Sequence, residues 1–398
     1  MSESSASTWP LERCEPKSVG MCPRRLERVG ELMGRYIEEG RIAGAVTLAA
    51  RRGRIPHLQC HGLMDLEKRT PMREDALFRI YSMTKIVTSA AVLMLVEEGR
   101  LLLAEPVSRF LPEFKQLRVA TKGADGQEEL VRPRRELTIH DLLTHTGGLS
   151  YDLIHEARDQ GWTLKRFVEE FCKRPLRRHP GEVWDYSAST DVLGRLIEVV
   201  AGMPFEDFLQ KRIFGPLGMT DTAFWVPPEK AGRLAALYKP DESGKLLPVM
   251  QLGDNSPAAG RPFLEKPALP SGGGGLVSST SDYLRFALML LWKGALGEVR
   301  LLGPKTVELM TSDHLPPGHP ALDNHRGFGL GVSVARRLGE LRQIGSVGEF
   351  GWGGAACTQA WIDPAEDMVT MIMTQLLPKE KAYFLDLFKQ AVYQSVVD

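Results

Sequence analysis

The chain lacks an excess of charge of either sign, a paired-cysteine motif and a long apolar run. Its 50 Lys and Arg residues balance 50 Asp and Glu residues, so net charge points to neither a nucleic acid nor an anionic membrane. The five cysteines are scattered and form no Cys-x-x-Cys pair, which argues against a disulfide framework and a thiolate zinc site. No apolar run approaches the ~20 residues that span a bilayer, and the polar amino terminus contains no signal segment. These absences predict a soluble, cytoplasmic protein that binds a small neutral substrate.

The order of helical and strand-like patterns predicts the fold class. An amphipathic helix over 23–40 precedes two strand-like runs about the turn at 52–54, and the final third holds four more strand-like runs and a closing helix. Strands at both ends with helices between them predict an α/β (α+β) protein. We expect a mixed, mostly antiparallel sheet built from both termini, flanked by helices, and a mostly helical second domain. The predicted divisions are residues 1–80, 81–284 and 285–398.

Two stretches in the middle of the chain read as long irregular loops. One, over 116–136, is charged, and the other, over 239–275, is rich in proline and glycine. Long loops in a compact enzyme often form lids or pocket walls, and flexible surface insertions have the same composition. Strand signals are scarce between residues 100 and 285, so helices are expected there.

The stretch YSMTKIVTSAAVLML places Ser82 and Lys85 at the start of the most hydrophobic helix that the sequence predicts. Side chains three residues apart lie on one helical face, so these two can touch. Burial of such a helix favours the neutral form of Lys85, because the ammonium group loses hydration. A neutral amine can take the proton of a serine hydroxyl at a helix amino terminus, where developing negative charge is stabilised. The alternative is a serine that caps a helix beside a solvated lysine.

Two further segments contain residue types suited to the same chemistry. Tyr186 follows a Pro-Gly turn and precedes a helix, so its hydroxyl can face a cleft and serve as a base, although most such tyrosines only pack. Glycines surround Trp352 just before a strand, where backbone can approach a ligand and an N–H can join an oxyanion hole. A bulge with a packing tryptophan is the alternative.

These segments, in this order, resemble the serine β-lactamase and penicillin-binding-protein superfamily, and within it the class C β-lactamases and family VIII carboxylesterases. The resemblance runs over nearly the whole chain and includes LTIHDLLTHTGGLSY, FGPLGMTDTAF and SGGGGLVSSTSDYLRF. It implies that Ser82 is the acylated nucleophile, that Lys85 is its base or base partner, and that Tyr186 shares the proton relay. It also implies an oxyanion hole formed by the N–H groups of Ser82 and Ala355.

The chain departs from the β-lactamase pattern at two substrate-binding positions. Ala188 stands where β-lactamases usually have asparagine, and Trp352, Gly353 and Gly354 stand where they have Lys-Thr-Gly. The first departure removes an amide that binds an acylamino side chain, and the second removes a cation that recognises the β-lactam carboxylate. Both make the expected site less polar, as in the family VIII esterases.

Other possible sites have weaker support. The chain contains no Gly-x-Ser-x-Gly elbow, and the four glycines at 272–275 are not followed by a phosphate-binding Gly-Lys-Ser/Thr. The resemblance makes His145 a structural residue rather than a base. His57 and His61 flank Cys60, but a strand sends Cys60 to the face opposite His61, so no metal site is expected.

The sequence therefore predicts a serine carboxylesterase that hydrolyses short-chain acyl esters through an acyl-enzyme on Ser82, with no metal or cofactor. The rival functions are a class C-type β-lactamase, an esterase with β-lactam side activity, and an acyltransferase to an alcohol. A non-catalytic binding protein on the same scaffold is the rival from another class.

Overall fold

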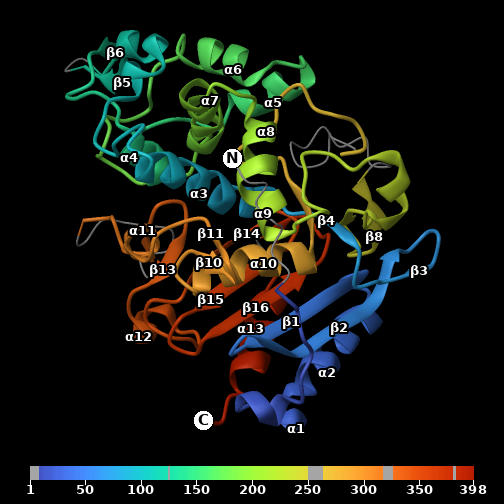
Figure 1. Cartoon of the computed structure of the whole chain (residues 1–398). Coiled ribbons are helices and arrows are strands. Elements are labelled where there is room, and N and C mark those ends of the chain that lie inside the picture. Colours follow the sequence, from blue (N-terminus) through green and yellow to red (C-terminus); the bar gives the residue numbers. More distant parts are fainter. Residues whose placement is uncertain (1–8, 124–125, 250–262, 317–325, 380–381) are drawn as a thin grey trace.

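The protein is built around one antiparallel sheet to which both ends of the chain contribute (Figure 1). The computed structural model describes residues 9–123, 126–249, 263–316, 326–379 and 382–398. The sheet has eight strands in the order β12-β13-β14-β15-β16-β1-β2-β3. Their bounds are β1 Gly44–Arg51, β2 Arg54–Asp65, β3 Thr70–Pro71, β12 Arg326–Phe328, β13 Ser333–Ala335, β14 Phe350–Gly353, β15 Gln359–Asp363 and β16 Met368–Met373. The two halves join where β1 pairs with β16, from Val46↔Met373 to Arg51↔Met368. The predicted fold class is confirmed.

Strand β1 is buried along its whole length because helices cover both faces of the sheet. Alternate side chains of a strand point to opposite faces. Val46 and Leu48 join the core that includes α10 (Thr280–Leu291), whereas Ala45 and Ala49 join the core of α2 (Arg28–Glu38) and α13 (Phe384–Tyr393). Figure 1 shows α10 on one side of the sheet and α2 and α13 on the other.

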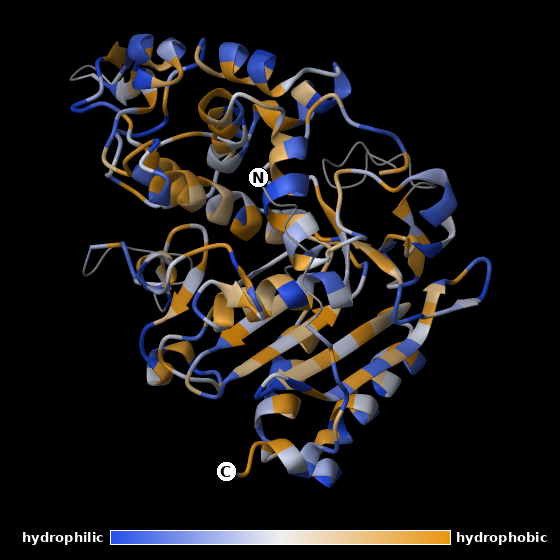
Figure 2. Cartoon of the chain, viewed as in Figure 1, coloured by the Kyte–Doolittle hydropathy of each residue, from blue (hydrophilic) through white to orange (hydrophobic). Residues whose placement is uncertain are grey.

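The middle of the chain forms a mostly helical region around α3 (Thr84–Glu97) and α7 (Ser189–Ala201). Every residue of α3 from Thr84 to Leu95 is buried, and Figure 2 shows most of this helix in the colours of hydrophobic residues. Helix α7 packs against α3, α4, α6 and α8. The remaining α-helices are α1 Pro23–Leu26, α4 Ile139–Leu143, α5 Leu153–Asp159, α6 Leu164–Phe171, α8 Phe205–Leu209, α9 Gly215–Leu217, α11 Pro304–Met310 and α12 Leu338–Leu341. The short helical turns are η1 Pro16–Val19, η2 Tyr81–Met83, η3 Val107–Arg109, η4 Pro112–Gln116, η5 Gln210–Phe214 and η6 Pro228–Arg233.

The predicted division into three segments stays a prediction. The boundary after residue 80 falls just before η2, at the start of the helical region. The boundary after residue 284 falls inside α10, which packs on β15 and β16 of the sheet. Among the described residues, no helix combines the length and apolar character needed to cross a bilayer.

Among the described residues, four small two-stranded ribbons lie outside the main sheet, and two of them, β5–β6 and β7–β8, fall in stretches that were expected to be irregular. The ribbons pair β4 Leu77–Arg79 with β9 Val277–Ser279, β5 Val119–Lys122 with β6 Glu128–Val131, β7 Tyr238–Pro240 with β8 Leu246–Pro248, and β10 Ala295–Leu296 with β11 Val299–Arg300. The expectation of an irregular loop over 116–136 is therefore wrong. Val119 anchors that hairpin, because it is buried and bridges to Leu176, a tertiary contact that local composition does not reveal. Of the loop predicted over 239–275, residues 250–262 lie outside the described part of the chain.

Candidate active site

Ser82 lies in η2, which leads directly into the buried helix α3. The preceding residue, Tyr81, has a φ of 41°, a left-handed conformation that is uncommon for residues other than glycine and clusters at functional sites. Lys85 lies one turn further on and is 1% exposed. Its Nζ atom lies 3.5 Å from Ser82 Oγ, so the predicted contact between the two side chains is present.

The Lys85 ammonium has an oxygen atom for each of its three N–H donors. Nζ donates to the Gly273 carbonyl oxygen at 2.6 Å, to the Tyr151 hydroxyl at 3.3 Å and to Ser82 Oγ at 3.5 Å. The ring of Tyr186 is also close, with its centroid 4.5 Å from Nζ. An ammonium that donates three N–H bonds has no lone pair with which to accept a proton.

The structure contradicts the prediction that burial keeps Lys85 neutral. Burial does lower the pKa of Lys85, but Tyr151, Tyr186 and the Asp191 carboxylate together outweigh it, so the net pKa lies above that of an exposed lysine. The sequence argument included the loss of hydration but not the oxygen atoms that the fold brings from other segments. Lys85 is therefore a cation at neutral pH.

Tyr151 is a candidate site residue that the sequence argument missed. Its hydroxyl accepts a hydrogen bond from Lys85, and its ring stacks on Tyr186 with centroids 5.8 Å apart and planes inclined by 14°. Burial raises the pKa of Tyr151, although the charge of Lys85 acts in the opposite direction. Its only signal in the sequence was its place at the end of LTIHDLLTHTGGLSY, one of the segments that carried the family resemblance.

Asp191 and the glycine-rich segment hold the carbonyl that contacts Lys85. Asp191 is fully buried on α7, where its Oδ1 accepts hydrogen bonds from Ser271 Oγ at 2.5 Å and from the Gly273 N–H at 3.2 Å. A Cβ atom added at Gly273 would lie 2.5 Å from Asp191 Oδ2, so only glycine fits this close approach. The glycines therefore pack a backbone segment against α7 and turn one of its carbonyls toward Lys85.

The segment from Trp352 to Ala355 approaches Ser82 from the end of β14. A Cβ atom at Gly354 would lie 2.4 Å from the Ile80 carbonyl oxygen, so glycine lets this segment pass close to the backbone just before Ser82. Trp352 Nε1 donates a hydrogen bond to the Tyr186 hydroxyl at 3.3 Å. Trp352 thus orients the predicted relay tyrosine from the position where β-lactamases carry lysine.

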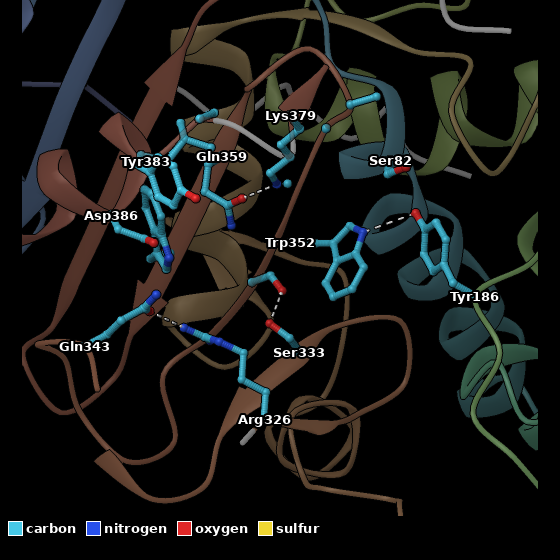
Figure 3. Close-up of a pocket in the computed structure, with 17 residues that line it drawn as sticks. Ser82, Tyr186, Arg326, Ser333, Gln343, Trp352, Gln359, Lys379, Tyr383 and Asp386 are labelled. Atoms are coloured by element: carbon cyan, nitrogen blue, oxygen red, sulfur yellow. Dashed lines mark hydrogen bonds between the residues drawn. The ribbon is translucent and has the colours of Figure 1, made fainter. Parts of the chain in front are cut away.

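Two cavities meet at Ser82, Tyr186 and Ala355. The larger has a volume of about 530 Å³, and its polar side chains include Arg326, Gln343, Gln359, Lys379 and Asp386. The smaller has a volume of about 410 Å³ and is lined further by Tyr81, Tyr151, His155, Arg158, Gly273 and Gly274. Figure 3 shows Trp352 between Tyr186 on one side and Gln359 and Lys379 on the other. Ser82, Tyr186 and Ala355 therefore lie at the junction of the two cavities.

Ala188 and His145 lie behind the cavity walls. Ala188 is 1% exposed and is not among the described residues that line either cavity, so its predicted contact with substrate finds no support there. His145 is fully buried; burial and the nearby Lys85 charge lower its pKa well below the usual value. Its Nδ1 accepts a hydrogen bond from the Ser187 N–H at 3.3 Å, and its carbonyl oxygen accepts one from the Asp185 N–H at 2.8 Å. His145 therefore supports the loop that carries Tyr186.

His57 and His61 converge on a threonine. Their Nε2 atoms each lie 2.8 Å from Thr47 Oγ1, on the neighbouring strand β1. Burial lowers the pKa of both histidines to about 4, so both are neutral at pH 7. Within the described ranges, no group of three or more His, Cys, Asp and Glu residues is arranged to hold a metal ion.

The chain is similar in sequence and in structure to known proteins over most of its length. The family model named Beta-lactamase matches residues 29–393. Protein Rv1367c of Mycobacterium tuberculosis is 34% identical over 360 residues, which cover 86% of this chain and 88% of that protein. Esterase EstB of Burkholderia gladioli is 33% identical over 377 residues, covering 87% of this chain and 89% of EstB. The solved structure of EstCE1, described as a hydrolase with promiscuous acyltransferase activity, superposes with a TM-score of 0.76 and 28% identity, covering 93% of this chain and 99% of EstCE1.

Proposed function

The chain belongs to the β-lactamase family and is a serine hydrolase, and from this premise we propose that it is a carboxylesterase acting on short-chain acyl esters, of the family VIII type. One observation carries the proposal. Ser82, in contact with the charged Lys85, opens onto two cavities beside Tyr186 and the backbone of Ala355. The likeness to esterase EstB supports the ester as the substrate class.

In the acylation step, Ser82 Oγ attacks the ester carbonyl carbon. Tyr186, whose ring lies beside the Lys85 ammonium, acts as the base and takes the hydroxyl proton of Ser82 on its phenolic oxygen. The carbonyl oxygen gains the negative charge, and the N–H groups of Ser82 and Ala355 stabilise it. Collapse of this intermediate breaks the bond to the alcohol oxygen, which receives the proton from Tyr186. The acyl group stays on Ser82.

In the deacylation step, water replaces the alcohol. Tyr186 takes a proton from the water, the hydroxide attacks the acyl carbon, and the proton returns to Ser82 Oγ as the acid leaves. Lys85 stays protonated and acts as a fixed positive charge. In this mechanism Tyr186 is the base and Lys85 its electrostatic partner, a choice that the raised pKa of Lys85 supports.

Transfer of the acyl group to an alcohol is a second candidate function. It is supported by the polar cavity beside Ser82, which could hold an acceptor alcohol, and by the likeness to EstCE1. The ratio of ester product to free acid in the presence of a competing alcohol separates the two activities. A cytoplasmic location stays a prediction.

A chain-length series of p-nitrophenyl esters, run beside nitrocefin, tests the proposal. We expect hydrolysis of acetate to hexanoate esters, weaker hydrolysis of nitrocefin, and loss of both activities in Ser82→Ala. The matched control is Ser312→Ala, an exposed serine whose replacement should leave the rates unchanged. Nitrocefin turnover comparable to that of the butanoate ester would favour the β-lactamase function instead. If a serine-directed phosphonate left Ser82 unlabelled in mass spectrometry, a non-catalytic role would replace both.

A further inference from the structure

The larger cavity contains a lysine, Lys379, although this chain has no lysine at the Lys-Thr-Gly position. Lys379, which follows β16 along the chain, lines the same cavity as Ser82 and Trp352. Its Nζ donates a hydrogen bond to Gln359 Oε1 at 2.8 Å. Gln359 begins β15 and pairs with Gly353 of β14, so the ammonium is tied to the strand pair that carries the substrate-binding segment.

Gly353 makes room for this ammonium. A side chain added at Gly353 would overlap both Lys379 Nζ and Gln359 Oε1. Gly353 stands at the position where the family's Lys-Thr-Gly motif has threonine. The Lys379 ammonium therefore occupies space that a side chain at position 353 would fill. Its positive charge lies next to position 352, where the motif has lysine and this chain has tryptophan.

The described residues that line this cavity include a second cation. Arg326 also lines it, where it donates to Gln343 Oε1 at 3.0 Å and lies 3.8 Å from Glu349 Oε1. Glu349 is fully buried and bound by Lys389, so it lies within the cavity wall. Asp386 is the acidic residue of the lining, and Figure 3 shows it beyond Gln359 on the side away from Ser82. Among the lining residues that the structure describes, the charged side chains are thus two cations, Lys379 and Arg326, and one carboxylate, Asp386.

The smaller cavity differs in character. Aromatic rings and glycine backbone form much of its lining, with His155 and Arg158 on α5. A short alkyl chain gains more from such a surface than from the charged cavity, because burial of apolar area is favourable while desolvation of charges is costly. We therefore place the acyl chain in the smaller cavity and the alcohol portion of the ester in the larger one.

We propose that Lys379 is a specificity-determining residue that binds a carboxylate on the alcohol portion of the substrate. The inference rests on the proposed esterase function and deepens it: the preferred esters carry a negative charge beyond the alcohol oxygen. The expectation of an uncharged substrate, drawn from Ala188 and Trp352, did not include Lys379, which lies 27 residues beyond Trp352 in the chain. A partly exposed ion pair of this kind changes affinity by about tenfold and is screened by salt.

The test compares 4-(butanoyloxy)benzoate with 4-(butanoyloxy)benzamide, two esters that differ in the charge at one end. We expect the wild-type protein at low salt to have a kcat/KM about tenfold higher for the benzoate, and 0.5 M NaCl to reduce this ratio. Lys379→Met should lower the ratio about tenfold, and Lys379→Arg should keep most of it. The control Lys305→Met removes a surface lysine of α11 with the same change of charge and should leave the ratio unaltered.

The outcomes separate this inference from the proposed function. If neither ester is hydrolysed and the phosphonate leaves Ser82 unlabelled, the esterase function itself fails. If the benzamide is hydrolysed but Lys379→Met keeps the wild-type ratio, only the assignment of Lys379 fails. If Lys379→Met instead impairs p-nitrophenyl hydrogen glutarate, whose carboxylate lies on the acyl side, the placement of the two ester portions is overturned.

Discussion

Two buried lysines on different helices, Lys85 on α3 and Lys389 on α13, differ in the direction of their pKa shift. Lys85 is 1% exposed and contacts a carbonyl, a phenol and a serine hydroxyl. Lys389 on α13 is 2% exposed, and its Nζ lies 2.7 Å from Glu349 Oε1. Burial lowers the pKa of Lys389 despite this carboxylate, whereas the groups around Lys85 raise its pKa above the usual value.

The difference shows that direct contact with a carboxylate does not decide the direction in which the pKa of a buried lysine shifts. Glu349 is also bound by Tyr393, whose hydroxyl donates at 2.8 Å, and the Arg326 charge further opposes the Lys389 ammonium. Around Lys85, two phenolic oxygens and the more distant Asp191 act in the same direction. Lys389 ties the last helix to the sheet, whereas Lys85 maintains a positive charge at the point where two cavities meet.

Replacement of Lys85 should produce the largest change in activity. Lys85→Met removes the charge beside Tyr186 and Ser82, and we expect kcat/KM for p-nitrophenyl butanoate to fall by about 10³-fold. Thermal unfolding should change little, because the variant also removes the cost of burying an ammonium. A folded Lys85→Met protein with activity within tenfold of wild type would contradict the assigned role.

Replacement of Lys389 should have its largest effect on stability rather than on activity. Lys389→Met leaves the Glu349 carboxylate buried without its cation, and we expect the free energy of unfolding to fall by about 3–5 kcal/mol. Urea denaturation measures this loss, and the double variant Lys389→Met with Glu349→Gln should recover part of it. If both Lys→Met variants lost stability equally, the contrast between a structural and a catalytic lysine would not hold.

Asp191→Asn tests the more distant charge that acts on Lys85. Loss of the carboxylate removes one cause of the raised pKa of Lys85 and loosens the hold on Gly273. We expect kcat/KM to fall about tenfold and the alkaline limb of its pH profile to move to lower pH, because Lys85 then loses its proton more easily. A lower rate with an unmoved alkaline limb would mean that Asp191 acts through packing alone.

His57 extends the comparison to a third buried basic side chain, one whose pKa shift includes no contribution from a described carboxylate. Its pKa falls from an ordinary 6.5 to about 4, chiefly through burial and further through His61. The unfolded chain therefore binds more protons, so this contribution to stability is complete above pH 6.5 and is lost as the pH falls toward 4. Between pH 7 and 5 the loss is about 2 kcal/mol for this histidine. His57→Gln should flatten the pH dependence of urea unfolding by that amount, and an unchanged slope would show that His57 does not cause it.

Much of the fold could be predicted from the sequence, because the residue patterns that indicate helices and strands are local. Alternating and helical patterns predicted the hairpin of β1 and β2, the closing helix and four strands that correspond to β13, β14, β15 and β16. They did not separate β12 from β13, because the two short strands fall at the ends of one strand-like run. The hairpin at 116–136 was missed because Val119 gains its burial from Leu176, more than fifty residues away. The division of the chain into three segments and the roles of the site residues stay predictions.

By itself, the sequence determined which segments could bear the chemistry. Three-residue spacing brings Ser82 and Lys85 together on one helical turn, and the apolar residues that follow bury that helix. Tertiary structure decided the charge of Lys85, because Tyr151, Tyr186, Asp191 and Gly273 come from segments far apart in the chain. It also decided the charge of the cavity, where Lys379 occupies the space left by a glycine. Electrostatic interactions depend on distance in space, and spacing along a chain reveals that distance only within a local element of structure.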